Sequence, residues 1–102
     1  MAPAVRRKKR KDEIKVTIAP FRNLADFKSC EDIQREVWHT QDIDVVPTPM
    51  LMAATHTGGI ILGAYNSLGD LVGFAFSILG TAGGTPIQHS HMLAVRMAYS
   101  HF

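Results

Sequence analysis

Apolar and polar residues alternate between Ile14 and Ala19, in the stretch IKVTIA. Alternation with a period of two places one set of side chains on one face of a strand, so this stretch predicts a β-strand that Pro20 ends. The pattern then changes to steps of three and four residues, which is the period of a helix. The apolar stripe of that helix comprises Leu24, Phe27, Cys30, Ile33 and Val37.

The first helix has clear start and end signals. Asn23 can accept a hydrogen bond from an otherwise unpaired backbone N–H group, and Asp26 places a negative charge in the first turn, where the helix dipole favours it. We expect the helix to run from this cap to Trp38. Cys30 lies within the apolar stripe, which predicts a small buried side chain and not a reactive thiol.

A second helix is predicted after the loop HTQDIDVVPTP, residues 39–49. Thr48 is expected to cap this helix, and Pro49 to occupy its first position, where a missing N–H group costs nothing. Gly58 and Gly59 are expected to end it. Its apolar side is formed by Met50, Leu51, Ala53 and Ala54.

Three more strands follow. The stretches IILGAY (residues 60–65) and LVGFAFSIL (residues 71–79) predict a hairpin around NSLGD, and IQHSHMLAV (residues 87–95) predicts the last strand. The glycine-rich GTAGGTP (residues 80–86) is expected to be a linker, because it leads into a strand and not into a phosphate-binding helix. The hairpin strands are apolar on both faces, which predicts helices on both sides of the sheet. The order β-α-α-β-β-β with a mainly antiparallel sheet defines an α+β fold.

The positive charge is confined to the start of the chain. Of the 11 lysines and arginines, six form an unbroken run from Arg6 to Lys11, which leaves five basic against nine acidic residues from Asp12 onwards. A like-charged block without aromatic residues predicts a disordered leader over residues 1–13, ahead of one domain over residues 14–102. The alternative is a tail that contacts nucleic acid through phosphates, although the acidic domain argues against a wider nucleic-acid surface.

Cysteine content and hydropathy narrow the cellular setting. A single cysteine excludes an internal disulfide and fits a reducing, cytoplasmic compartment. No apolar run approaches the roughly 20 residues of a membrane helix, so no membrane partner is expected. The basic start is not followed by an apolar segment, so it is not predicted to be a secretory signal.

Two histidines supply the candidate chemistry. His89 and His91 are two residues apart on the last strand, so their side chains are expected on one face, with Ser90 on the other. Imidazoles can act as a general base near neutral pH or contact a substrate. A zinc site needs three or four ligands, and nothing in the sequence brings further ligands close, so no metal site is predicted. The plain alternative is two polar residues on a partly open strand face.

Several separated segments together resemble one known family. FRNLADFKSCEDIQREVW, DIDVVPTPML, THTGGIILGAY, LVGFAF and HSHMLAV are similar to the N-terminal half of the GNAT acetyltransferase superfamily, and to one branch of predicted GNAT proteins in particular. The resemblance covers residues 14–95. It implies the acyl-CoA N-acyltransferase fold, acetyl-CoA as cofactor, and acetyl transfer to an amine on a small molecule or a peptide.

The resemblance also implies roles for particular residues. His89 and His91 match positions that hold a base or a water molecule next to the acceptor. The backbone N–H groups that would contact the pantetheine arm and the thioester oxygen belong to Leu93, Ala94 and Val95. The wall of the acceptor site is matched by Asp42, Asp44, Met50 and Met52.

The sequence departs from the family after the last strand. The family continues with a glycine-rich turn that opens a helix, whose N–H groups hold the CoA pyrophosphate. Here Val95 is followed by RMAYSHF, and Tyr99 does not match the family's thiolate-protonating tyrosine. We therefore expect a truncated domain that ends after the fourth strand and has little or no activity. Its unpaired strand edge predicts a homodimer, and the alternative function is a non-catalytic binding or dimerisation module.

Overall fold

A computed structural model describes residues 15–39, 41 and 44–100. Within these residues the elements follow the predicted order β-α-α-β-β-β, which confirms the α+β fold. The elements are β1 (Thr17–Pro20), α2 (Leu24–Trp38), α3 (Thr48–His56), β2 (Ile60–Tyr65), β3 (Leu71–Ala82), β4 (Thr85–Val95) and the 3₁₀ turn η3 (Met97–Tyr99). No described helix is long and apolar enough to cross a bilayer. The basic run Arg6–Lys11 lies outside the described residues.

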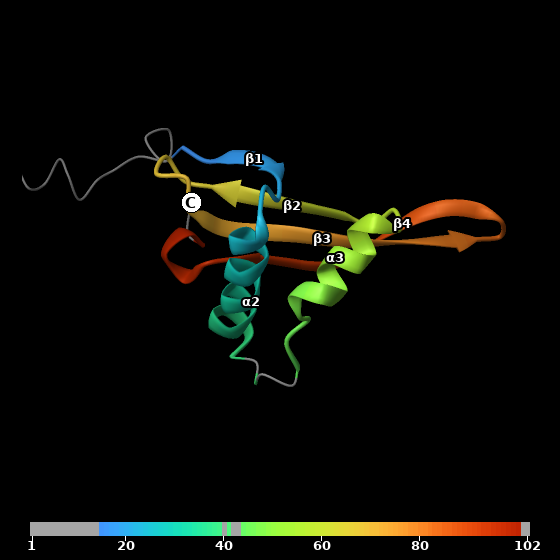
Figure 1. Ribbon diagram of the computed structural model, residues 1–102, viewed down its shortest axis with the longest axis horizontal. Helices are drawn as coiled ribbons and strands as arrows, with labels where there is room; N and C mark the ends of the chain where they lie inside the picture. Colours follow the sequence, from blue (N-terminus) through green and yellow to red (C-terminus); the bar gives the residue numbers. More distant parts are fainter. Residues whose placement is uncertain (1–14, 40, 42–43, 101–102) are drawn as a thin grey trace, which may run out of the picture.

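The four strands form one antiparallel sheet in the order β1-β2-β3-β4 (Figure 1). A tight turn joins β2 to β3. In it the Asn66 side-chain oxygen accepts hydrogen bonds from the N–H groups of Leu68 and Asp70, at 3.0 and 2.9 Å. Gly69 has a φ of 86°, which residues with a Cβ atom rarely adopt. The hairpin is therefore closed by residues 66–70, the NSLGD stretch from which the hairpin was predicted.

The β3–β4 hairpin is longer than predicted. β3 continues to Ala82 and β4 begins at Thr85, so only Gly83 and Gly84 connect the two strands. Both glycines have positive φ angles, 57° and 83°, as a two-residue hairpin turn requires. The predicted linker over residues 80–86 is therefore wrong, because a glycine pair closes a hairpin without a longer loop. The tip of the hairpin projects beyond α3 (Figure 1).

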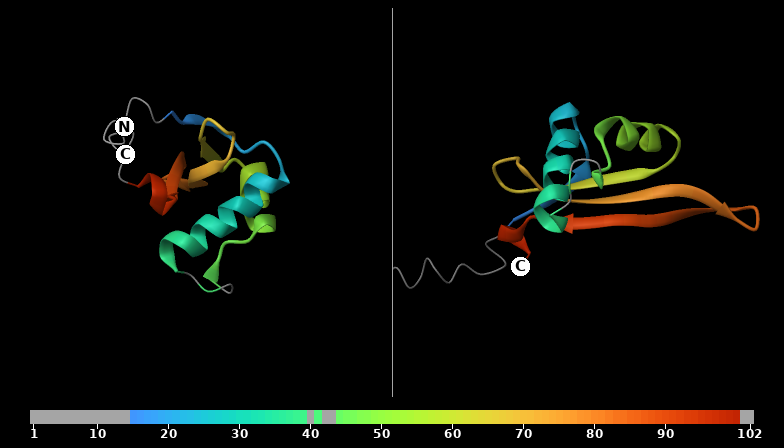
Figure 2. Two further views of the ribbon diagram at one scale, coloured as in Figure 1. Left: turned by 90° about the vertical axis from the view of Figure 1, so that its left-hand side faces the viewer. Right: turned by 90° about the horizontal axis from the view of Figure 1, so that it is seen from below.

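Both helices lie on one face of the sheet (Figure 2). The prediction of helices on both sides is therefore wrong for the described residues. Apolar side chains on the opposite face are largely uncovered, since Ile18 is 61% exposed and Leu93 71% exposed. A shallow apolar groove of about 220 Å³ crosses this open face. The double-sided hydrophobicity of the strands thus marks a surface that the described helices do not cover.

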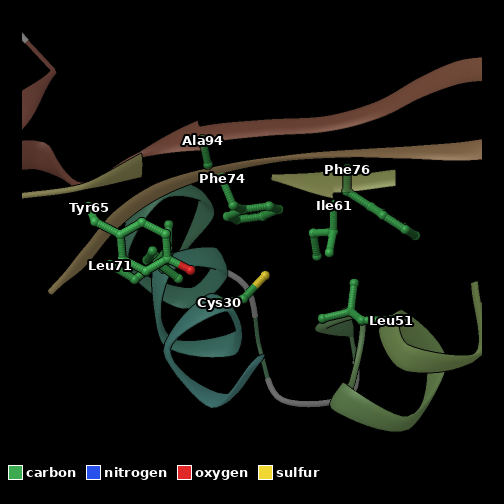
Figure 3. Packing of buried hydrophobic residues seen from close by; sticks show 9 residues of the cluster. Cys30, Leu51, Ile61, Tyr65, Leu71, Phe74, Phe76 and Ala94 are labelled. Carbon is green, nitrogen blue, oxygen red and sulfur yellow. The ribbon is translucent and has the colours of Figure 1, made fainter. Parts of the chain in front are cut away.

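The hydrophobic core lies between the helices and the covered face of the sheet (Figure 3). Cys30 and Ile33 of α2 and Leu51 of α3 are fully buried there, in one cluster with Phe74 and Phe76 of β3. Burial raises the pKa of the Cys30 thiol to about 12. The thiol therefore stays protonated, which confirms the prediction of a structural cysteine.

The predicted start is confirmed for α2 and wrong for α3. The Asn23 side chain accepts a hydrogen bond from the Asp26 N–H group at 3.1 Å. Thr48 is the first helical residue of α3 and not its cap, a position that Pro47 holds. The N–H and hydroxyl groups of Thr48 instead donate to the Glu31 carboxylate, at 2.6 and 2.7 Å. A carboxylate from α2 thus satisfies the start of α3 from outside the helix.

Two smaller predictions also change. The first strand begins at Thr17 and includes Pro20, while Ile14 lies outside the described residues. Leu24 is 58% exposed, so the buried stripe of α2 starts at Phe27. Leu24 is the first residue of the helix and is not part of the core cluster.

Candidate functional site

An apolar pocket of about 410 Å³ lies between α3 and the strands β3 and β4. None of its described lining residues is an aspartate, glutamate, lysine or arginine. The hydroxyl group of Thr57 already donates to the carbonyl groups of Ala53 and Ala54, both at 3.1 Å. The pocket is lined by Val46, Met50, Ala53, Ala54, Thr57, Phe76, Ile78 and His91.

Two polar side chains of α2 hold Val46 and the start of α3, from which part of the pocket wall comes. The buried Gln34 amide donates to the Val46 carbonyl at 3.0 Å and accepts from the Val46 N–H group at 2.8 Å. Glu31 holds the start of α3 through Thr48, and the hydrogen bond from the Thr48 hydroxyl lowers the pKa of Glu31. Because both contacts join residues distant in the chain, the helical pattern of α2 did not indicate them.

A β-bulge in β4 presents His91 to the pocket. Phe76 pairs with Met92 and Ser77 pairs with Ser90, so His91 is an extra residue without a partner on β3. Its ring meets the Phe76 ring edge to face, with centroids 6.0 Å apart. Bulges re-aim side chains next to functional sites, and this bulge places an imidazole at the rim of an apolar pocket.

The structure brings the two predicted histidines together. The rings of His89 and His91 lie with their centroids 6.0 Å apart. Ser90 instead lines a shallow hollow with Ile60 and Leu62, on the open face of the sheet. The expected arrangement of two histidines on one face is therefore present, although only His91 lines the apolar pocket. The chemical roles of both histidines stay predictions.

The residues expected to form the acceptor wall separate in the structure. Met50 lines the apolar pocket, whereas Met52, on the same helix, does not. Asp44 is exposed and is not part of the lining, and Asp42 lies outside the described residues. The wall is instead completed by Ala53 and Ala54 and by Val46 from the loop.

The backbone of β4 offers hydrogen-bond donors at a free edge. The Arg96 N–H group donates to the Val72 carbonyl of β3 at 2.8 Å. Because N–H groups alternate in direction along a strand, those of Leu93 and Val95 point away from β3. The N–H group of Ala94 points towards β3, and its side chain is buried in the core. Leu93 and Val95 are thus the two residues of the predicted set whose donors face the free edge.

The chain after β4 forms a short 3₁₀ turn held by one carboxylate. Arg96 donates to Glu36 at 2.9 Å and to the Leu71 carbonyl at 3.2 Å. The Met97 N–H group donates to Glu36 at 2.6 Å. These hydrogen bonds, first from Met97 and then from Arg96, lower the pKa of Glu36. Within the described residues no glycine-rich turn opens a helix here, so the pyrophosphate-binding arrangement of the resembled family is not formed.

A second, polar pocket of about 540 Å³ lies beside the start of α2. Asp26 is buried there and accepts hydrogen bonds from the Arg22 N–H group at 2.8 Å and the Tyr65 hydroxyl at 2.9 Å. The Arg22 guanidinium group stacks over the Tyr65 ring at 4.0 Å. Burial alone would raise the pKa of Asp26, but the hydrogen bonds from Arg22 and Tyr65 lower it overall.

Tyr65 responds in the opposite direction. Burial, followed by its hydrogen bond to Asp26, raises the pKa of Tyr65 to about 12. Asp26, Arg22 and Tyr65 therefore hold one another, and Arg22 also donates to the Gly69 carbonyl at 2.9 Å. Although this pocket is the larger, its contacts are those of a structural ion cluster. The sequence pattern indicated Asp26 only as a negative charge in the first turn of α2, and it did not indicate Tyr65 as the partner of Asp26.

Comparison with known proteins places the fold. No protein-family model matches the sequence, and no curated protein matches it significantly. A solved structure, described as a GCN5-related glucosamine N-acetyltransferase region in a fungal multi-domain GH3 β-N-acetylglucosaminidase, superposes with a TM-score of 0.64 at 14% identity. The match covers 85% of this chain and 10% of that chain. The chain has a GNAT-like fold. An identity this low establishes the GNAT-like architecture alone, so activity and substrate rest on the site.

Proposed function

We propose that this chain carries the acceptor-binding and thioester-contacting part of a GNAT-type N-acetyltransferase, which transfers acetyl from acetyl-CoA to an amine. The observation that carries the proposal is the position of His91 on β4, next to the strand segment that bears two outward N–H groups. An imidazole and a pair of oriented backbone donors on one strand provide a proton acceptor beside an oxyanion contact. We assign the chain to the branch of predicted GNAT proteins that its segments resemble.

The residues present fit one end of acetyl-CoA better than the other. The N–H groups of Leu93 and Val95 would hold the pantetheine arm and the thioester oxygen. The pyrophosphate has no matching cradle in the described residues, because Arg96 is engaged by Glu36 and by the Leu71 carbonyl. The described residues would therefore hold the cofactor through its pantetheine arm.

His91 is the residue proposed to handle the proton. When bound, acetyl-CoA supplies an acetyl thioester, whose C–S bond is replaced by a C–N bond to the acceptor while the amine proton ends on the departing thiol. The His91 imidazole would accept the proton of an amine that enters the apolar pocket and then pass it to the departing thiolate. His89 stands beside it and orients the ring or holds a water molecule.

Calorimetric titration with acetyl-CoA and with S-acetylpantetheine tests the proposal. Both should bind weakly, with affinities within about tenfold of each other, a difference of about 1.4 kcal/mol. Leu93→Pro and Val95→Pro each remove one outward N–H group without removing a bond to β3. Each should weaken S-acetylpantetheine binding about threefold to tenfold, the range of one hydrogen bond.

Leu93→Ala and Val95→Ala are the matched controls, because they retain both backbone donors. They should bind like the unmodified chain. Folding of each variant is checked by circular dichroism. If neither ligand binds a folded sample, the acyltransferase proposal fails. If acetyl-CoA binds far more tightly than S-acetylpantetheine, the assignment of the pantetheine arm as the only grip is wrong.

A second candidate function is a dimerisation module, and the free edge of β4 favours it. β4 has 11 residues, none of them Asp, Glu, Lys or Arg, and within the described residues it pairs only with β3. β1, at the opposite edge, has only four residues and ends at Pro20. Proteins protect exposed edges by short strands, proline, bulges and charge; β1 is short and ends in proline, whereas β4 has Pro86 at one end and a bulge at His91 but no charged residue along its length. We propose that β4 pairs with β4 of a second copy.

Sedimentation equilibrium tests whether the chain dimerises through β4. The chain should form a concentration-dependent dimer, and Ser90→Lys should shift it towards monomer by placing like charges at the paired edge. Ser67→Lys, in the exposed β2–β3 turn, is the control and should leave the dimer intact. A chain that stays monomeric, or a dimer that Ser90→Lys does not affect, overturns the proposal. Nucleic-acid contact by Arg6–Lys11 and a cytoplasmic location stay predictions.

A further inference from the structure

We infer that the apolar pocket takes a small primary amine with an apolar body, such as an arylalkylamine, and rejects amino sugars. The inference rests on the proposed function, since it names the acceptor class of the same site. It differs from what the fold likeness would suggest, because the similar solved structure is described as a glucosamine N-acetyltransferase region. At 14% identity that likeness establishes the fold, and the pocket lining decides the ligand.

The lining offers almost no hydrogen bonds to a ligand. Its only side chains with polar groups are Thr57 and His91, apart from the thioether of Met50. The Thr57 hydroxyl is already committed to two backbone carbonyl groups of α3. A sugar that enters this pocket would leave its hydroxyl groups without partners, which weakens binding. An aryl or alkyl group would instead remove apolar surface of both partners from water.

The size and shape of the pocket suit such a group. Its volume of about 410 Å³ lies within the range of small-molecule sites. The Phe76 ring, which is nearly fully buried, lines the pocket on the sheet side. On the α3 side the lining includes the small side chains of Ala53 and Ala54. The small alanine side chains leave room for a ring, and Phe76 provides an aromatic partner for it.

The charge of the wall selects the form of the amine. The wall comes from the loop at Val46, from α3, from β3 and from β4, and none of its described lining residues is Asp, Glu, Lys or Arg. The titratable groups on these elements are His91 in the lining, His89 with its ring centroid 6.0 Å from that of His91, and His56 in the last turn of α3. An ammonium group in contact with this wall would give up part of its hydration and meet no opposing carboxylate there. The pocket should take the neutral amine, with the imidazole of His91 as the nearest group able to accept its hydrogen bond.

Titration of the ¹⁵N-labelled full chain with three probes, followed by NMR, tests the inference. 2-Phenylethylamine should shift resonances of Ala53, Phe76 and His91, and should bind at least tenfold more tightly than glucosamine. 2-Phenylethanol has the same ring without the ionisable nitrogen. It should bind equally at neutral and alkaline pH, whereas the amine should bind more tightly as the pH rises and it loses its proton.

Two variants test whether the pocket itself is responsible. Ala53→Phe fills the pocket and should reduce 2-phenylethylamine binding at least tenfold. Met52→Phe, on the same helix but outside the lining, should leave binding unchanged. Met50→Ser is a milder variant of a 60%-exposed side chain and should reduce binding about threefold without a packing cost. Binding that survives both lining variants would overturn the pocket assignment.

The outcomes separate this inference from the acyltransferase proposal. Glucosamine binding as tight as that of 2-phenylethylamine, or amine binding that is independent of pH, would overturn the acceptor class. If S-acetylpantetheine binds and 2-phenylethylamine does not, the acceptor class fails while the acyltransferase proposal stands. If 2-phenylethylamine binds in the pocket and neither thioester binds, the ligand class stands and the acyltransferase proposal fails.

Discussion

Two pockets on the helix-covered side of this sheet are built from opposite chemistry. The polar pocket at the start of α2 contains a buried carboxylate, Asp26, which is bound by Arg22 and Tyr65. The apolar pocket beside α3 contains one imidazole, His91, whose ring contacts within the described residues are with Phe76 and His89. The first pocket is larger, but its buried carboxylate is already held by Arg22 and Tyr65. The second is smaller, and its imidazole is free to meet a ligand.

The difference shows how charge can be divided between stability and function. A buried ionised group that is fully hydrogen-bonded stabilises the fold, and removing one of its partners is costly. A histidine at the rim of an apolar wall contributes little to folding and can hydrogen-bond a ligand through its ring nitrogens. We therefore expect variants of the polar pocket to change mainly the free energy of unfolding, and variants of the apolar pocket to change mainly ligand binding.

The largest expected effect comes from the anchor of α3. Leu51→Ala removes a fully buried side chain and should lower the free energy of unfolding by about 2–5 kcal/mol. It should also loosen the wall of the apolar pocket. Urea unfolding provides the measurement, with the partly exposed Met52→Ala as the control, expected below about 1 kcal/mol. Equal losses in the two variants would contradict the packing of α3 against the sheet.

The next effect comes from the polar pocket. Asp26→Ala removes the acceptor of Tyr65 and Arg22, and should lower the free energy of unfolding by about 1.5–3 kcal/mol. Asp70→Ala, an exposed residue of the same pocket, is the control and should cost less than about 0.5 kcal/mol. Urea unfolding compares the two. Binding of 2-phenylethylamine to the folded Asp26→Ala chain should be unchanged, and a large loss of binding would mean that the two pockets are coupled.

A smaller effect is the response of stability to acid. The pKa of Asp26 is lowered in the folded chain, so its contribution is present above the unfolded pKa of about 3.9 and is lost as the pH falls through the folded value. Glu31 and Glu36 have lowered pKa values as well and act in the same direction. Stability should therefore fall as the pH drops below about 4.5.

Variants show where this acid response originates. Asp26→Asn should flatten the dependence of unfolding free energy on pH, while Leu51→Ala should run parallel to the unmodified chain. The measurement is urea unfolding at several pH values between about 7 and 3. A chain that becomes more stable on acidification through this range would show that the hydrogen-bonded carboxylates are not held as described.

The smallest effect concerns the helix cap. Asn23→Ala removes the acceptor for the Asp26 N–H group and should cost about 1 kcal/mol. Lys28→Ala, exposed on the same helix, should change stability by less than about 0.5 kcal/mol. Thermal unfolding of both variants, followed by circular dichroism, compares them. A silent Asn23→Ala would mean that the ion cluster alone fixes the start of α2.

Elements with local signals could be predicted from the sequence. Asn23 caps α2 as expected, and the Asn66–Asp70 turn closes its hairpin through its own side chain. These features depend on residues within four positions of each other. The long-range contacts were not accessible in this way. Tyr65 lies 39 residues from Asp26, and Val46 lies 12 residues from Gln34, so no periodicity links either pair.

Two predictions were wrong for different physical reasons. Hydrophobic residues on both faces of β2 and β3 predict helices on both sides, yet the described helices cover one face. Hydrophobicity records that a surface is suited to burial, and it does not identify what covers it. The glycine-rich residues 80–86 were predicted to be a linker, whereas the positive φ angles of Gly83 and Gly84 make a tight hairpin turn.

The candidate site was predicted only in part. Period-two alternation correctly placed His89 and His91 together. It could not show the bulge that carries His91 to the pocket, because a bulge depends on the register with β3. Met52 was predicted to share the acceptor wall with Met50, but of the two only Met50 lines the apolar pocket.

Chemical-shift mapping of the ¹⁵N-labelled chain with S-acetylpantetheine tests the central claim most directly. The claim is that the ligand site lies on β4 beside the apolar pocket, and not in the polar pocket. We expect chemical-shift changes centred on the N–H groups of Leu93 and Val95 and on His91. Shifts confined to Arg22, Asn23 and the other residues around Asp26 would contradict it, and would assign the ligand to the polar pocket.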